Sequence, residues 1–134
     1  MEIWKLVKDM RILDEEIENR LLKIAELRCS VGCRGISYGE RVQGSHEPDK
    51  MAAVMSEVIE LENEVDFMVD RLVEIKRTFR EVASKLNNPL ERDVVIKLYP
   101  ENKSPEMTAT ECERSVRQIY RIRKKAMEKL EQMS

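Results

Sequence analysis

Residues 51–86 carry an apolar side chain at the first and fourth positions of every seven-residue repeat. The series has eleven members and no exception: Met51, Val54, Val58, Leu61, Val65, Met68, Leu72, Ile75, Phe79, Val82 and Leu86. Alternating steps of three and four residues place these side chains along one seam of an α-helix, which is the pattern of a coiled coil. The repeat predicts one helix from about Pro48 to Leu86, roughly 58 Å long at 1.5 Å per residue.

The N-terminal segment follows the same pattern with one interruption. Its seam consists of Ile3, Leu6, Met10, Leu13, Ile17, Arg20, Ile24, Leu27 and Val31, so a charged residue stands at Arg20. We expect a helix from about Glu2 to Cys29, and two helices with such seams predict an antiparallel coiled-coil hairpin. All four glycines of the chain lie between the two seams, which predicts a long polar loop at 30–47.

The second predicted helix has more apolar surface than one partner helix would cover. A strip beside its seam is formed by Met55, Ile59, Val69 and Val73. The helix also extends beyond the first by roughly ten residues, about 15 Å at 1.5 Å per residue. We therefore expect a homo-oligomer formed through the two long helices. The alternative is that the C-terminal domain folds back and covers the overhang.

The pattern after Pro89 predicts shorter helices. Apolar residues from Leu90 to Leu98 share one face of a helix of about ten residues that Pro100 ends. Ser104-Pro105-Glu106 has the serine cap, proline and early acid of a helix start, and 115–118 has the spacing of a capping box that opens a last helix to about Gln132. Two capped helices with a turn at Glu113-Arg114 predict a helix-turn-helix.

Composition agrees with an all-α fold. The chain has 42% hydrophobic and 37% charged residues, but only six aromatic residues and four glycines, so the turns and aromatic strands of a β-sandwich are missing. The expected architecture is a coiled-coil helical hairpin at 1–86 followed by a small helix-turn-helix domain at 87–134.

The last predicted helix has separate apolar and basic faces. At 100° per residue, Ile119, Ile122, Ala126 and Leu130 share one face and the arginines and lysines lie opposite. Residues 114–129 contain seven basic residues and one acid, whereas residues 1–86 have 14 basic and 18 acidic residues, a net charge of −4. This local basic face predicts an anionic partner, double-stranded DNA. The alternative is a basic face that is simply solvated.

The helix-turn-helix assigns expected roles to individual side chains. The N-terminal part of the second helix enters the major groove, so side chains there can reach base edges, namely Arg117, Gln118 and Arg121 with Tyr120 beside them. Side chains that lie where phosphates would pass are Arg114, Ser115, Lys124 and Lys125.

Residues 115–130, SVRQIYRIRKKAMEKL, resemble the recognition helix of sigma-factor region 4. Together with Glu40-Arg41-Val42-Gln43-Gly44-Ser45 before the long helix, and with Leu90 and Tyr99, the chain resembles a family of prophage-encoded, sigma-like transcriptional regulators of Gram-positive bacteria, related to autolysin regulators and late-operon activators. Ala109 and Cys112 fit the pattern. Thr108 stands where the family usually has isoleucine, and Glu113 where it usually has glycine.

The resemblance implies a phage or prophage transcription regulator whose hairpin oligomerises and whose helix-turn-helix binds promoter DNA. A contact with RNA polymerase, as sigma region 4 makes, is left open. Two other functions fit the same residues: a DNA-packaging protein similar to a small terminase subunit, and a coiled-coil adaptor whose basic helix binds an acidic protein surface. Ring-shaped oligomers would favour the packaging protein, and a lack of DNA affinity would favour the adaptor.

Nothing in the sequence predicts an enzyme, a metal site or a cofactor. Cys29 and Cys33 with His46 supply only three ligands, and Cys112 belongs to another helix. No nucleophile, acid and base can be assembled around the single histidine. The longest stretch without a charged residue is 51–56, far below the roughly 20 residues of a membrane span. Three cysteines, an odd number, and the lack of a secretory signal predict a cytoplasmic protein with free thiols.

Overall fold

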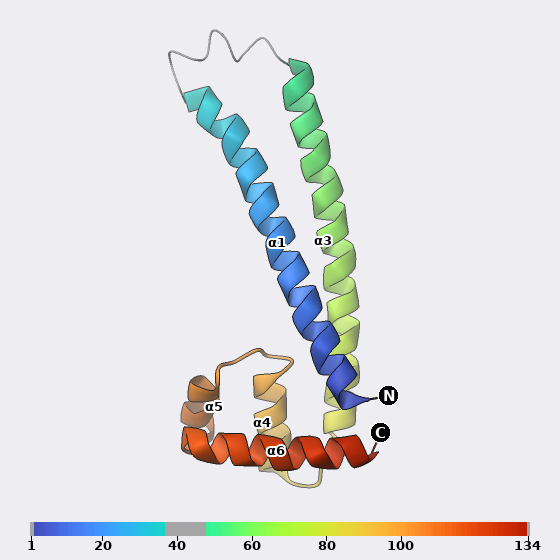
Figure 1. Ribbon diagram of the computed structural model, residues 1–134, viewed down its shortest axis with the longest axis vertical. Helices are drawn as coiled ribbons and strands as arrows, with labels where there is room; N and C mark the ends of the chain where they lie inside the picture. Colours follow the sequence, from blue (N-terminus) through green and yellow to red (C-terminus); the bar gives the residue numbers. More distant parts are fainter. Residues whose placement is uncertain (1, 37–47, 134) are drawn as a thin grey trace. The chain divides into compact units, whose positions relative to one another are not determined.

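The computed structural model describes residues 2–36 and 48–133, and for residues 32–36 and 48 it describes the backbone alone. Within these ranges the chain is entirely helical, with α1 at Ile3–Ile36, α3 at Pro48–Ala83, α4 at Pro89–Leu98, α5 at Pro105–Cys112 and α6 at Val116–Met133. α1 and α3 run side by side in opposite directions, and the three short helices pack on one another (Figure 1). The predicted all-α fold, a hairpin followed by short helices, is confirmed.

The two predicted seams are the faces that α1 and α3 bury. Every seam position of α1 is buried or half-buried, and so is every seam position of the second repeat except Met51. Burial of these apolar side chains is the main contribution to holding two helices together, because each removes most of a side chain from water. The heptad pattern therefore predicted the hairpin interface residue by residue.

The chain divides into two compact units. One contains residues 13–71 and is called the hairpin unit; the other contains both chain ends, residues 1–12 and 72–134, and is called the terminal unit. The terminal unit thus includes the first turns of α1, the last turns of α3 and the three short helices. Position 86/87, the boundary expected from sequence, lies inside this unit.

Arg20, the charged residue in the seam of α1, is satisfied within the hairpin unit. Its Nε donates to Glu64 Oε2 of α3 at 3.4 Å, and its Nη1 donates to the carbonyl oxygen of Glu16 at 3.3 Å. The apolar core around it contains Ile24, Val58 and Val65. A long arginine side chain can occupy the edge of such a seam because its aliphatic stem packs while its guanidinium reaches a carboxylate.

α1 is longer than the sequence predicts. It continues through residues 30–36, which were expected to begin the polar loop, and it includes Gly32 and Gly35. Glycine lowers helix stability by about 1 kcal/mol relative to alanine but does not forbid helical dihedral angles, whereas proline would. With 34 residues in α1 and 36 in α3, the expected overhang of α3 is wrong. The remainder of the expected loop, 37–47, lies outside the described residues.

The predicted end of the second long helix is also displaced. α3 ends at Ala83, and Leu86 N and Lys85 N donate to carbonyl oxygens three residues back, at 3.0 and 3.1 Å. Such bonds tighten the last turn of a helix into a turn of 3₁₀ type. Leu86 is nevertheless buried, so the last seam residue packs from this turn and not from the helix.

α5 begins where its predicted serine cap stands, whereas the cap of α4, Asn88, was not among the predicted caps. Asn88 accepts a hydrogen bond from Leu90 N at 2.9 Å at the start of α4, and Ser104 Oγ accepts one from Met107 N at 3.1 Å at the start of α5. Each cap satisfies a backbone N–H that has no partner inside its helix. Their common core contains Val94, Ala109 and Ile119.

A carboxylate of α5 joins this helix to α4 and to the connecting segment. Glu111 Oε1 accepts hydrogen bonds from Lys103 Nζ at 2.8 Å and from Lys97 Nζ at 3.0 Å. Hydrogen bonds from these two lysines lower the pKa of Glu111 below its ordinary value. The pair of ammonium groups thus favours the charged form of the carboxylate and holds the α4–α5 arrangement.

The first testable prediction concerns Thr108, which lies in the core of the terminal unit. Its side chain is fully buried, and among the described residues its Oγ1 has no hydrogen-bond partner. Thr108→Val should therefore stabilise the protein by about 1 kcal/mol, because it removes an unsatisfied hydroxyl from a site of similar shape. Urea denaturation measures the change. Thr110→Val is the control, since Thr110 Oγ1 donates to the carbonyl oxygen of Glu106 at 3.1 Å; an equal gain there would contradict the explanation.

Candidate nucleic-acid interface

The turn between α5 and α6 is closed by the backbone at Glu113 and Arg114. Glu113 adopts a left-handed conformation, φ 57° and ψ 44°, and Arg114 N donates to the carbonyl oxygen of Ala109 at 2.9 Å. Glycine is the usual residue in this conformation at a helix end, since the conformation costs a residue with a Cβ atom about 1 to 2 kcal/mol. The turn therefore forms although the sequence departs from glycine.

The start of α6 is a complete capping box. Ser115 Oγ accepts from Gln118 N at 3.2 Å, and Gln118 Oε1 accepts from Ser115 N at 3.0 Å. The predicted box is confirmed. The side-chain oxygen of Gln118 also accepts from Ser115 Oγ at 3.3 Å, so both of its lone pairs are used within the protein and its NH₂ group remains for another partner. Gln118 thus caps the start of α6, and its contact with DNA stays a prediction.

α6 is anchored through one apolar stripe. Ile119, Ala126, Met127 and Leu130 are buried, and Ile119 packs against Val94 of α4 and Ala109 of α5. Because the stripe occupies one side of the helix, the residues on the opposite side remain in contact with solvent. The predicted separation of the faces is thus present in the structure.

Four cations occupy that exposed side. Arg117, Arg121, Lys124 and Lys125 are exposed, and none makes an ion pair or hydrogen bond with any other residue in the described ranges. Arg114 is also exposed, and its Nη1 donates to the carbonyl oxygen of Glu113 at 3.4 Å. The four charges within α6 share about 100° of the helix circumference at 100° per residue, and Arg114 lies in the turn just before the helix. Such a face is well suited to a polyanion.

Two of the seven basic residues of this segment are withdrawn from the face. Lys129 Nζ donates to both carboxylate oxygens of Glu91 on α4, at 2.9 and 3.0 Å. Arg123 is half-buried, and its guanidinium lies over the ring of Tyr120 at 5.3 Å from the ring centre. Burial raises the pKa of Tyr99, and Arg123 opposes this shift. Counting charges along the sequence does not distinguish these two residues from the other five.

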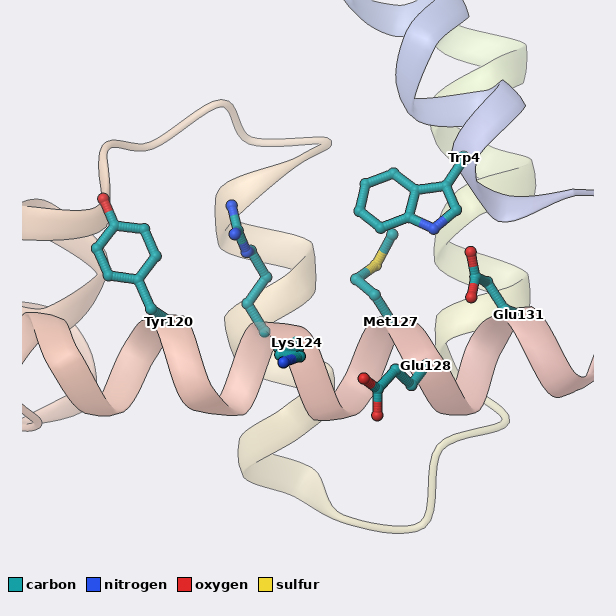
Figure 2. A pocket seen from close by; sticks show the side chains of 7 residues that line it. Trp4, Tyr120, Lys124, Met127, Glu128 and Glu131 are labelled. Carbon is teal, nitrogen blue, oxygen red and sulfur yellow. The ribbon is translucent and has the colours of Figure 1, made fainter.

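A cavity of about 550 Å³ adjoins the exposed side of α6 (Figure 2). Its walls come from both ends of the terminal unit and consist of Trp4, Tyr120, Arg123, Lys124, Met127, Glu128 and Glu131. Trp4 makes an edge contact with Tyr99, with ring centres 6.5 Å apart, which holds the first turn of α1 in this unit. No local pattern in the sequence could associate Trp4 with α6, because more than 110 residues separate them.

The charges around the cavity limit the basic face along α6. Along α6, Lys124 is followed one helical turn later by Glu128. A phosphate chain would be attracted by Lys124 and repelled by Glu128. The surface suited to an anion therefore belongs to the N-terminal half of α6 and ends near Lys124, while Tyr120 lies at its edge.

The second prediction separates positioning from reading at the start of α6. Gln118→Ala removes half of the capping box and should lower stability by about 0.5 to 1 kcal/mol, with the sequence preference for DNA retained. Thermal denaturation measures the first effect and selection of bound DNA fragments the second. Gln132→Ala, an exposed glutamine near the end of the same helix, should change neither. Altered base preference without loss of stability would show that Gln118 reads bases.

The residues considered for a metal site do not form one in the described ranges. Cys112 is a free thiol, and the side chain of Cys33 and the whole of His46 lie outside those ranges. Within them no three histidine, cysteine or acidic side chains are grouped to hold an ion.

None of the helices in residues 2–36 and 48–133 is both long and apolar enough to span a bilayer. Comparisons of the chain with protein families, with characterised proteins and with solved structures found no match.

Proposed function

We propose that this chain is a DNA-binding transcription regulator that reads double-stranded DNA with α6. The observation that carries the proposal is the set of exposed cations on α6, which have no counter-charge in the described structure and lie opposite a buried stripe on the second helix of a helix-turn-helix pair. In such a pair the N-terminal half of the second helix enters the major groove. Arg117 and Arg121 are the proposed base readers, and Arg114, Lys124 and Lys125 the phosphate contacts.

The distribution of charge between the units supports the same proposal. The terminal unit, residues 1–12 and 72–134, has 17 basic and 12 acidic residues, a net charge of +5, whereas the hairpin unit has 7 and 14, a net charge of −7. A polyanion is attracted to the first unit and repelled by the second. Phage origin, a cytoplasmic location and a contact with RNA polymerase are further proposals that rest on the resemblance to sigma region 4.

The test is a selection of bound fragments from the source genome at fixed salt, with binding constants measured for the enriched sequence and for random DNA. A regulator should prefer its own site by a factor on the order of 10³ or more. Lys124→Ala should weaken binding to both and reduce the salt dependence by about one counterion. Equal affinity for all DNA sequences would favour the packaging function. A lack of DNA binding would favour the coiled-coil adaptor.

We further propose that the chain forms a homo-oligomer through the hairpin, with α1 as the contacting helix. α3 does not extend beyond α1 as the sequence predicted, so an overhang does not support this proposal. The support is that Leu21 and Leu22 of α1 are both more than half exposed. Between residues 13 and 31 α1 has five acids and three bases, so a second copy can place opposite charges across a shared interface.

The third prediction is that light scattering on the full chain at tens of micromolar reports more than one copy, and that the double change Leu21→Ser and Leu22→Ser reduces the mass toward one. The physical reason is that these side chains are buried only in the oligomer. A dimer is expected of a regulator and a ring of a packaging protein. A monomeric unaltered chain would refute self-association.

A further inference from the structure

The outer surface of α3 between residues 51 and 70 combines exposed apolar side chains with unbalanced negative charge. Its large exposed apolar residues are Met51, Met55, Ile59, Phe67 and Val69, and Phe67 is 69% exposed. Side chains of this kind stand singly on most surfaces, and several along one helix mark an interaction site. We name this surface, with the carboxylates described next, the acidic α3 face.

The same segment contains six acids and no base. Two of the acids are neutralised within the hairpin unit, because Glu62 pairs with Arg28 and Glu64 with Arg20 of α1. The other four, Glu57, Glu60, Asp66 and Asp70, make no ion pair with any residue that the structure describes. At 100° per residue, Asp66 and Asp70 lie on the same side of α3 as Met55 and Ile59, and Glu60 on the same side as Phe67, whereas Glu57 lies toward the opposite edge.

We propose that the acidic α3 face is a docking surface for a partner protein, and that the partner presents an amphipathic helix with Lys or Arg beside its apolar stripe. An apolar stripe buries the exposed side chains of α3, and basic flanks neutralise the carboxylates that are left unpaired. Both requirements follow from the same 20 residues.

The alternatives fit this face less well. DNA and anionic lipid carry the same sign of charge as the face. A second copy that presented the same face would oppose carboxylate to carboxylate, unlike α1, whose charges have both signs.

The side chains that a partner can use are also ordered along the helix. Met51, Met55 and Ile59 follow at steps of four residues, so the partner's stripe meets an apolar strip about 12 Å long at 1.5 Å per residue.

The probe is a set of three synthetic helical peptides with one apolar stripe and with lysine, glutamine or glutamate beside it. Fluorescence anisotropy of labelled peptide measures binding to the full chain. The lysine peptide should bind at least about tenfold more tightly than the glutamine peptide, and more weakly as salt is raised. The glutamate peptide should not bind. Equal affinity for all three would overturn the proposal.

Matched variants locate the site. Ile59→Ser with Phe67→Ser should weaken the lysine peptide about tenfold, because both side chains lose apolar area at the contact. Asp66→Lys with Asp70→Lys should abolish its advantage over the glutamine peptide. Met107→Ser and Glu2→Lys with Glu81→Lys, in the terminal unit, are controls for exposed apolar area and for charge, and should have little effect. Circular dichroism verifies the fold of each variant, which exposed positions should preserve.

Two results would contradict this assignment. If the control variants weaken binding of the peptide as much as the variants of the acidic α3 face do, binding is a general effect of negative charge. If Ile59→Ser with Phe67→Ser abolishes self-association measured by light scattering, the occupant of the face is a second copy. DNA binding by α6 is measured separately and does not enter either result.

Discussion

Replacing both Arg117 and Arg121 with alanine is expected to abolish preferential binding to the selected DNA site while the protein remains folded. Each arginine should contribute roughly 1 to 3 kcal/mol at a specific site, because a guanidinium donates two hydrogen bonds to a base edge in the major groove. Both side chains are exposed and make no contact that the described fold depends on. The loss should therefore appear in binding constants and not in the melting temperature.

The control keeps the charge and changes the geometry. Arg117→Lys with Arg121→Lys preserves two positive charges but removes the planar fork of donors. It should retain most of the affinity for random DNA and its salt dependence, and lose the preference for the selected site. If the alanine double variant binds the selected site with unchanged affinity, α6 is not the recognition helix. If the lysine variant retains the preference, the arginines act on phosphates.

Removing the ammonium group of Lys129 is expected to be the most destabilising change at an ion pair of this chain. The Glu91 side chain is only 4% exposed, whereas that of Lys129 is 43% exposed. Lys129→Met would leave a buried carboxylate without its partner, a loss of roughly 3 kcal/mol. Glu91→Gln should cost less, because the ammonium group of Lys129 can turn to water. The single tryptophan, Trp4, lies in the same unit and reports its unfolding in urea by fluorescence.

The double variant provides the decisive comparison for that pair. Glu91→Gln with Lys129→Met removes both charges and should recover most of the stability lost by Lys129→Met alone, since no unpaired charge remains. Lys125→Met, an exposed lysine on the same helix, should change stability little. Additive losses in the double variant, or an equal loss at Lys125, would show that the pair does not hold α4 to α6.

Local pattern was sufficient for the helices and for the faces they bury. The heptads of residues 3–31 and 51–86 predicted which side chains pack between α1 and α3, and Ser104 and Ser115 predicted where α5 and α6 begin. These features depend on spacing within a few residues, because helix periodicity and caps are local properties of the backbone. The end of α1 was not predictable in this way, since Gly32 and Gly35 lower helix stability without forbidding the helix.

The same distinction between local pattern and tertiary packing applies to the candidate site. The sequence by itself determined that α6 has a basic face opposite a buried one, because both follow from residues at 100° intervals on one helix. Only the tertiary structure decided which charges stay on that face. Lys129 forms an ion pair with Glu91 of α4, and Arg123 lies over the ring of Tyr120 and close enough to Tyr99 to affect its pKa. The tertiary structure also brought Trp4 beside the last helix. Contacts between residues far apart in the chain depend on how helices pack, which no short-range spacing encodes.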